Sequence, residues 1–520
     1  MKRIIWKGSV QMSFSTVMTA AVFGMKVELV HVEADVSNGL PAFHMVGYLS
    51  SEVKEAAERV QTAIRNSGFD YPPKRTVVNL SPATMRKRGA SFDLPVAVAI
   101  LLSLGQVKTN KIKDMLLIGE IGLDGKIRGV QGILSIVLAA KEAGIRKCLI
   151  PEANVAEGML VEGISIIGVA TLKDAVEYLN GKKENKIHPR FRVEYKKNEK
   201  TIDYSEISGQ EYVKRAIEIA VAGGHNLLMI GAPGSGKTMI AKRIPTIFPP
   251  LTKEESIEIT KIYSILGLLD QTSPLIQERP FRNVHHTATK TALTGGGITP
   301  MPGEISLAHE GVLFLDELPE FQKSVLEVLR QPLEERKIRI TRTHGNYTFP
   351  ANFMLVAAMN PCPCGCYPDM NRCVCTPYQI QHYLSKVSQP FLDRIDICVE
   401  AAKVEYEDLI AHNKNVESSE MIRQRVCKAR EIQAIRYRGT KITVNAMLDI
   451  KGLEQYCVLG EQEELLMKQA FVNLGLTARM YHKILRVART IADLSGSEEI
   501  KTEHIAEAVG YRTFQKQLWR

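Results

Sequence analysis

The chain has 520 residues, of which 45% are hydrophobic and 24% are charged, and its formal net charge is +10. This length is too great for one hydrophobic core and predicts about two to four domains, and the composition is that of a soluble globular protein. No internal repeat is evident, which argues against a solenoid. The positive balance favours a polyanionic partner only weakly.

Nothing in the sequence predicts a membrane partner. The N-terminus lacks a long apolar core followed by a small-residue cleavage site, and the most apolar run, residues 94–105, is too short to span a bilayer. We therefore expect a cytoplasmic protein. In that compartment the nine cysteines are not expected to form disulfides.

Two stretches dominate the N-terminal part: PKRTVVNLSPATMRKRGASFDLPVAVAILLSLG at 73–105 and GEIGLDGKIRGVQGILSIVLAAKEAGIRKCLIPEAN at 119–154. They resemble the proteolytic domain of Lon-type proteases, which implies an α+β domain over residues 1–180. Peptide hydrolysis in that family would use a Ser/Lys dyad. Ser91 lies where the nucleophile would, but Leu134 takes the position of the lysine and cannot accept a proton. We therefore predict an inactive Lon-like domain used for assembly or partner contact.

A change in composition separates this domain from the rest of the chain. Residues 181–200 carry eight Lys or Arg against three Glu and few periodic apolar residues. We predict a solvated basic linker over residues 181–203. A basic arm that contacts nucleic acid is the alternative.

Residues 204–402 alternate strand-like runs with helices, which predicts a parallel α/β sheet. The first of these runs leads into GAPGSGKT, which fits the pattern G-x-x-x-x-G-K-[ST]. Glycines let successive N–H groups face phosphate oxygens, Lys237 would charge-pair with the terminal phosphates, and the Thr238 hydroxyl suits Mg²⁺. The predicted ATP ligands are Gly231, Ala232, Pro233, Gly234, Ser235, Gly236, Lys237 and Thr238.

Two later strand ends supply the chemistry that a phosphate loop lacks. GVLFLDELPEF, at 311–321, ends an apolar strand with two carboxylates, Asp316 for Mg²⁺ and Glu317 for water activation. FMLVAAMNP ends in Asn360, which could hold the attacking water or sense the γ-phosphate. A lone Asn after a strand more often caps a turn.

The chain resembles the YifB/ComM family of magnesium-chelatase-like AAA+ ATPases over nearly its whole length. The resemblance is carried by GAPGSGKT, RPFRNVHHTATKTALTGGG, PMPGEISLAHEGVLFLDELPEF, AAMNPCPCG, FLDRIDI and LTARMYHKILRVARTIADL. It implies ATP and Mg²⁺ as cofactors and a homo-oligomeric ring, usually a hexamer. It also implies an α/β architecture with an AAA+ P-loop domain at 204–402 and a helical lid at 403–520.

The same resemblance gives two arginines a role in catalysis. Arg394, in FLDRIDI, would be an arginine finger acting on the ATP of the neighbouring subunit, where a guanidinium can neutralise charge on the γ-phosphate. A structural salt bridge with Asp393 or Asp396 is the alternative. Arg479, in the TAR segment, would be a second sensor that reaches the γ-phosphate in cis.

The helical lid carries a run of basic residues after Arg479. Lys483, Arg486 and Arg489 follow at spacings that place them near one helix face. We expect a solvated face, with a ligand-facing stripe as the alternative.

Five cysteines lie within CPCGCYPDMNRCVC, residues 362–375. Four thiolates suffice for a tetrahedral zinc site, although two C-x-C pairs are less common than C-x-x-C pairs. The family resemblance covers the two C-x-C pairs, and Cys366 looks additional. We predict a structural Zn²⁺ on Cys362, Cys364, Cys373 and Cys375, with free thiols in a loop as the alternative.

The stretch IRITRTHGNYTFPANF is predicted to form a hairpin with Gly345-Asn346 at its tip. In related AAA+ rings this hairpin points into the central pore, where Arg339, Arg342 and His344 could contact DNA phosphates. A surface hairpin with incidental charge is the alternative.

A second candidate pore-facing insert, residues 282–297, contains the adjacent His285 and His286. On regular structure their rings would face different ways, so they are a poor metal pair.

Because ComM-type proteins are associated with branch migration, the resemblance implies an ATP-driven helicase on branched or single-stranded DNA, acting in recombination or natural transformation. A chelatase-like protein-remodelling ATPase that acts on a protein partner is the alternative.

Overall fold

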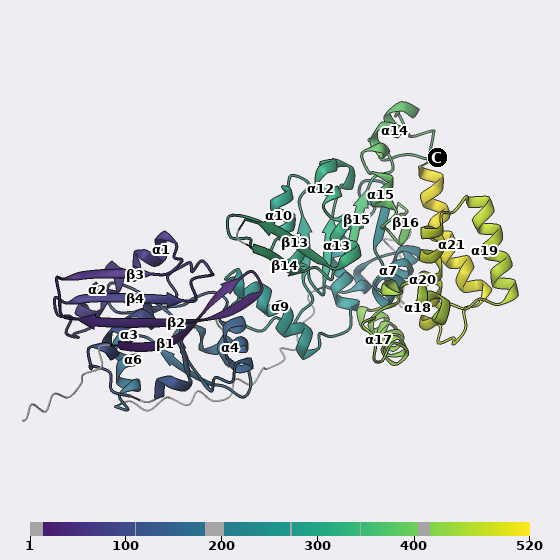
Figure 1. The fold of residues 1–520 in the computed structure, drawn as a ribbon. Coiled ribbons are helices and arrows are strands. Elements are labelled where there is room, and N and C mark those ends of the chain that lie inside the picture. The colour runs from purple at the N-terminus through teal and green to yellow at the C-terminus, as the bar shows by residue number, and fades with distance from the viewer. Residues whose placement is uncertain are drawn as a thin grey trace, which may run out of the picture. The chain divides into compact units, whose positions relative to one another are not determined.

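The computed structural model describes residues 14–109, 111–182, 202–270, 273–343, 345–403 and 417–519. Most of the predicted basic linker and His344 lie outside these residues. The described residues form two compact units, one containing those up to residue 182 together with 256–276, and the other containing the remainder (Figure 1). No helix in the described part of the chain is both long and apolar enough to cross a membrane. Each unit is described by itself below.

The N-terminal unit is built on a mixed sheet with the order β3-β4-β2-β1-β5-β8-β9. β1 pairs antiparallel with β2 and β2 with β4, whereas β5, β8 and β9 run parallel. Alternate residues of β2 are buried, because one side of each strand faces the core. The strands of this unit are β1 (Phe14–Phe23), β2 (Lys26–Ser37), β3 (Ala42–Val46), β4 (Arg75–Ser81), β5 (Met115–Leu117), β6 (Glu120–Ile121), β7 (Ile127–Arg128), β8 (Lys147–Pro151) and β9 (Ser165–Val169).

The apolar run at 94–105 forms most of α3, the core helix of this unit. Ten of its eleven residues are buried, which explains a sequence that is apolar on every face. Asp93, its first residue, is fully buried and receives two hydrogen bonds from Arg59, at 3.0 and 3.1 Å. The helices are α1 (Ser51–Lys54), α2 (Ala56–Asn66), α3 (Asp93–Ser103), α4 (Ile133–Glu142), α5 (Val155–Gly158) and α6 (Leu172–Leu179).

Leu134, the residue at the expected lysine position, is fully buried near the start of α4, and its N–H donates to Glu157 at 2.8 Å. A buried aliphatic side chain there offers no base to Ser91. That the Lon-like domain is inactive stays a prediction.

Residues 256–276 come from the middle of the chain but pack within the N-terminal unit. They begin inside α9 (Lys253–Ile265), whose Ile259 and Ile262 are fully buried. The Ser264 hydroxyl donates to Glu157, and the Ser264 carbonyl accepts the Gly132 N–H at 3.1 Å. This excursion of the chain is not apparent from the sequence pattern.

The C-terminal unit contains a parallel sheet with the order β11-β12-β15-β10-β16. β10 is buried along its whole length, as are β12 and β15, which is typical of a parallel sheet covered on both faces. After β10 the chain forms other strands and then adds β15 on one side of β10 and β16 on the other. A crevice is therefore expected at the carboxyl end of β10. The strands are β10 (Leu227–Gly231), β11 (Phe281–Val284), β12 (Val312–Leu315), β15 (Met354–Met359) and β16 (Ile397–Ala401), with a separate hairpin of β13 (Lys337–Arg342) and β14 (Gly345–Pro350).

Helices surround this sheet and make up the C-terminal part of the chain, which confirms a mixed α/β protein with a helical C-terminus. In Figure 1, α19, α20 and α21 lie side by side at the yellow end of the colour scale. The helices are α7 (Glu211–Gly223), α8 (Lys237–Arg243), α10 (Lys290–Thr294), α11 (Glu304–Leu307), α12 (Lys323–Glu327), α13 (Arg330–Glu335), α14 (Pro377–Ser385), α15 (Gln389–Leu392), α17 (Ser419–Arg436), α18 (Ile450–Tyr456), α19 (Glu461–Leu474), α20 (Ala478–Leu494) and α21 (Thr502–Leu518).

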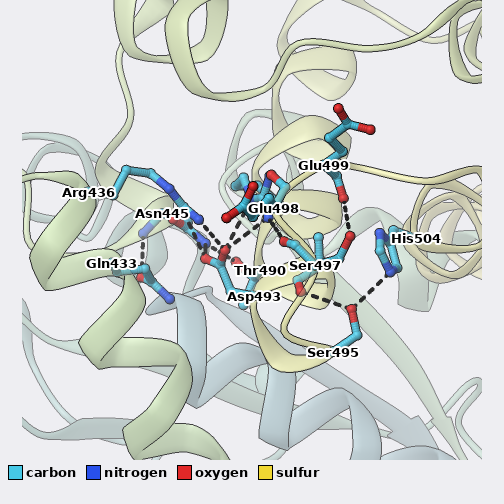
Figure 2. Close-up of polar contacts among 12 residues, drawn as sticks. Gln433, Arg436, Asn445, Thr490, Asp493, Ser495, Ser497, Glu498, Glu499 and His504 are labelled. Atoms are coloured by element: carbon cyan, nitrogen blue, oxygen red, sulfur yellow. Dashed lines mark hydrogen bonds and ion pairs between the residues drawn. The ribbon is translucent and has the colours of Figure 1, made fainter.

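A buried polar network holds these C-terminal helices together (Figure 2). Asp493, on α20, is 2% exposed and accepts hydrogen bonds from Arg436 on α17 and from Asn445. Arg489 donates to the same carboxylate at 3.1 Å. A buried carboxylate needs such partners, and loss of one partner is strongly destabilising.

The basic run on α20 is neither a solvated face nor a ligand-facing stripe, so both expectations for it were wrong. Lys483 pairs with the buried Asp396 at 2.7 Å, and Arg486 donates to the carbonyl of Leu448 at 2.9 Å. Arg489 is 3% exposed. The helix uses its cations to satisfy buried acceptors, which spacing along the helix does not reveal.

Candidate active site

The phosphate loop lies between β10 and α8, at the carboxyl edge of the parallel sheet. Gly231 is needed because a Cβ there would come 2.2 Å from the carbonyl oxygen of Ala401. Gly236, at φ 83°, sets the left-handed turn from which α8 begins. Lys237 donates from Nζ to the carbonyls of Gly231 and Ala232, both at 2.8 Å. Burial lowers the pKa of Lys237, and an anion in the loop would favour its charged form.

Two strand ends bring polar side chains to this loop. The Thr238 hydroxyl donates to Asp316 Oδ2 at 2.5 Å, and Lys237 Nζ lies 3.3 Å from Asn360 Oδ1. Asp316 follows β12 and Asn360 follows β15, the strand between β12 and β10. The structure therefore brings the predicted phosphate, magnesium and sensor residues into one cluster.

Glu317 is held in an uncommon backbone conformation beside Asp316. Its φ is 53°, a left-handed value that is rare for a residue with a side chain, and its N–H donates to Asp316 Oδ1 at 2.9 Å. Such strain is often retained at functional sites. A cavity of about 440 Å³ adjoins Glu317 and Asn360 and is also lined by Tyr383, whose pKa burial raises to about 12.

His286 is a site residue for which the sequence suggested no role. Its Nδ1 lies 3.6 Å from Glu317 Oε2, and its ring meets the edge of Phe321 at 6.5 Å between centroids. The ring of His285 lies 4.2 Å from that of His286. The expectation that the two rings face different ways applied to regular structure, and both residues instead follow the end of β11.

Arg394 and Arg479 share one carboxylate. Arg394 Nη2 is 2.8 Å and Arg479 Nη2 is 3.2 Å from the same oxygen, Glu334 Oε1 on α13. Arg394 is 8% exposed and also donates to the carbonyl of Arg330 at 3.3 Å. Arg394 therefore forms its ion pair with Glu334. It does not pair with Asp396, one of the partners expected for a structural salt bridge, because Asp396 pairs with Lys483.

The four predicted zinc ligands form one cluster. Their sulfur atoms all lie within 4.8 Å of one another, and Cys362 Sγ is 3.3 Å from Cys364 Sγ and 3.8 Å from Cys373 Sγ. A tetrahedral zinc with Zn–S bonds of about 2.3 Å requires sulfurs about 3.8 Å apart, whereas a disulfide requires about 2.05 Å. The donors therefore fit a four-thiolate metal site.

The pKa values of the thiols in this cluster are shifted in different directions, because burial and the neighbouring thiols raise the pKa of Cys373 to about 12 and also raise that of Cys375. A backbone hydrogen bond from Cys366 is the main cause that lowers the pKa of Cys364 to about 6, and the thiolate is the form that binds metal. Cys366 is not among the four clustered sulfurs of the described residues, and its thiol faces the Cys364 carbonyl at 3.7 Å.

The hairpin of β13 and β14 differs in one detail from the expected one. Arg342 pairs with Gly345, so Gly345 and Asn346 open β14 rather than forming the tip. The contact expected for His344 lies outside the described residues. Arg339 is largely exposed, and Arg342 is exposed and donates weakly to the Gly297 carbonyl at 3.4 Å. The hairpin and the 282–297 insert therefore lie together.

Three family models match the chain. Their descriptions are magnesium chelatase, subunit ChlI, over residues 203–409; subunit ChlI of Mg-chelatase, over residues 32–154; and magnesium chelatase, subunit ChlI C-terminal, over residues 416–512.

The chain is also similar to curated proteins over its whole length. The competence protein ComM of Haemophilus influenzae is 42% identical over 510 residues, which cover 98% of this chain and 99% of ComM. YifB of Escherichia coli is 42% identical over 508 residues, which cover 98% of each chain. A Lon protease of Trichlorobacter lovleyi is 28% identical over 134 residues, which cover 24% of this chain and 16% of that protease. The chain therefore belongs to the YifB/ComM family of magnesium-chelatase-like proteins.

Proposed function

We propose that the chain is an ATP-hydrolysing AAA+ motor. The observation that supports this most is the convergence of Lys237, Thr238, Asp316, Glu317 and Asn360 at adjacent strand ends. Mg²⁺ bound to ATP supplies charge neutralisation on the phosphates. The chain's own residues then bind phosphate through Lys237, hold the metal through Thr238 and Asp316, and accept a proton from water through Glu317.

The motor is proposed to be a homo-oligomeric ring, with a hexamer as the expected state. Arg394 and Arg479 share Glu334, and no hydrogen bond in the described chain joins either guanidinium to its own phosphate loop. Because the Glu334 carboxylate holds both guanidiniums close together, a single anionic ligand would contact both of them. We therefore propose that both act on the ATP of the neighbouring subunit, in place of the cis role expected for Arg479.

The substrate is proposed to be branched or single-stranded DNA. Support comes from the exposed Arg339 and Arg342, from the net charge of +10, and from the similarity to a competence protein. A protein-remodelling ATPase is the second candidate, favoured by matches to the magnesium chelatase subunit along the chain.

The full chain should hydrolyse ATP faster when forked or four-way DNA is added, because the ring would engage phosphates in its pore. DNA affinity should fall linearly with salt on a logarithmic scale, with a slope of about −0.7 to −0.9 per phosphate contacted. The measurement is steady-state ATP turnover with and without DNA at several salt concentrations, with Lys237→Ala as the nucleotide-binding control.

Matched variants locate the DNA contact. Arg339→Gln and Arg342→Gln should each reduce the magnitude of the salt slope by about 0.7 to 0.9, whereas Lys337→Gln, which is exposed at the base of the same hairpin, should not. ATP turnover that no DNA structure stimulates would instead favour the protein-remodelling candidate.

His286→Ala should lower kcat by about tenfold to a hundredfold with little change in KM, because Glu317 would lose the neighbour that orients it. His286→Asn should restore part of the loss, since it keeps an N–H donor. Thr287→Val is the control, because it removes the hydrogen bond of His285 and leaves the ring of His285 beside that of His286. Steady-state kinetics that are the same for His286→Ala and the wild type would remove His286 from the mechanism.

The four-cysteine cluster is proposed to hold a structural Zn²⁺. The sulfur separations and the lowered pKa of Cys364 support this choice, and Zn²⁺ is the common occupant of tetrahedral thiolate sites.

A further inference from the structure

The cysteine cluster is continuous with the nucleotide site through the backbone. Asn360, whose side chain meets Lys237 at 3.3 Å, lies two residues before the fully buried Cys362. Pro363, between the first two cysteines, lines the same cavity as Glu317 and Asn360. A change in the shape of this loop would therefore reach the wall of the active site.

A second contact joins the cluster to the phosphate loop itself. Gly365, between Cys364 and Cys366, packs so closely on Pro233 that an added Cβ would lie 2.3 Å from its Cδ and 3.0 Å from its Cγ. Gly365 also has φ 80°, and its N–H donates to the Cys362 carbonyl at 3.0 Å. A shift of this turn toward the phosphate loop would therefore press on Pro233.

A bound metal would fix the shape of that turn. Cys362 and Cys364 lie just before Gly365 in the chain. Cys373 and Cys375 come from the far end of the same loop, and all four sulfurs lie in one cluster. Metal–thiolate bonds across the loop would link its two ends and add to the packing and hydrogen bonds that otherwise hold these residues.

We propose that metal binding at the four cysteines and nucleotide binding at the phosphate loop are thermodynamically coupled through the contact of Gly365 with Pro233. Metal binding raises the affinity for nucleotide, linkage then requires that nucleotide raise the affinity for metal by the same factor, and the ATPase responds to zinc supply. This inference rests on the proposed function, because it assumes that the loop binds ATP.

The experiment uses the full chain and two ligands, Zn²⁺ and a non-hydrolysable ATP analogue. Elemental analysis should find about one zinc per chain after gentle purification, consistent with one four-thiolate site. Removal of zinc by a chelator under reducing conditions should weaken binding of the analogue by about fivefold to 150-fold, the usual range for coupled sites, and added Zn²⁺ should restore it. Saturating analogue should make zinc harder to extract by the same factor.

Glycine variants test whether the coupling passes through Pro233. Gly365→Ala should keep its zinc but bind the analogue more weakly. Gly439→Ala is the matched control, because Gly439 has φ 82° and a Cβ there would meet nothing within 4 Å. Adding Pro233→Ala to Gly365→Ala removes the ring that the new Cβ would strike, so analogue binding should partly recover. Cys366→Ser, outside the four-sulfur cluster, should keep both ligands.

The outcomes separate the coupling from the function on which it rests. Equal analogue affinity in zinc-loaded and zinc-free protein would overturn the coupling while leaving both sites in place. Absence of zinc from a folded chain would overturn the metal site and the coupling together. Failure of both forms to bind the analogue would overturn the proposed function as well.

Discussion

Arg394→Ala should lower ATP turnover by about 10³- to 10⁵-fold while nucleotide binding is retained, as expected for an arginine finger. The physical reason is that a guanidinium supplied by the neighbouring subunit neutralises charge that develops only in the transition state. The measurement is steady-state turnover together with equilibrium binding of an ATP analogue. Glu334→Gln is the first control, because it removes the ion pair and keeps both guanidiniums, and it should retain turnover.

Mixing variants distinguishes a catalytic arginine from a structural one. Arg394→Ala and Glu317→Gln are each expected to be inactive alone, but in mixed rings some interfaces combine an intact Glu317 with an intact neighbouring Arg394. At equal mixing, about a quarter of the interfaces would be complete if the rings assemble head to tail and at random. No recovery of turnover in rings shown to be mixed would contradict action in trans. Thermal unfolding of Arg394→Ala checks that loss of a buried side chain has not unfolded the chain.

Glu317→Gln should lower kcat by about 10²- to 10⁴-fold, the usual contribution of a general base, and should leave ATP binding and ring formation intact. The amide has nearly the shape of the carboxylate but cannot take the proton of the attacking water. Single-turnover measurements should therefore show ATP that is bound and not cleaved.

A neighbouring carboxylate provides the control for this variant. Glu320 lines the same cavity as Glu317 and pairs with Lys386 at 3.3 Å, so Glu320→Gln should hydrolyse ATP normally. An equal loss of kcat in both variants would mean that hydrolysis depends on the negative charge of the cavity and not on a general base at residue 317.

The parts of this site that could be predicted from sequence are those fixed by local rules. A strand, a glycine turn and a lysine at set spacing define a phosphate loop wherever they occur, and carboxylates after a buried strand must reach the edge of a parallel sheet. The structure accordingly brings Thr238 to Asp316 and Lys237 to Asn360. The cysteine spacing likewise indicated a cluster that the sulfur positions suit.

The features that sequence could not supply depend on tertiary neighbours. Nothing in the pattern around His286 indicates that its ring lies near Glu317, because the two residues follow different strands, β11 and β12. The spacing of Lys483 and Arg489 fits a solvated face as well as a buried one, and only the acceptors Asp396 and Asp493 decide between them. The shared carboxylate of Arg394 and Arg479 comes from a third helix, α13.

The packing of residues 256–276 within the N-terminal unit limits how this protein can be dissected. A truncation that starts after the basic linker would remove the N-terminal core with which Ile257 and Leu275 pack and would leave Ser264 without Glu157. The resulting fragment would expose Ile257 and Leu275 within its ATP-binding half, and we expect it to be less stable and more prone to aggregation than the full chain. Expression boundaries and domain swaps therefore have to keep residues 256–276 together with the N-terminal unit.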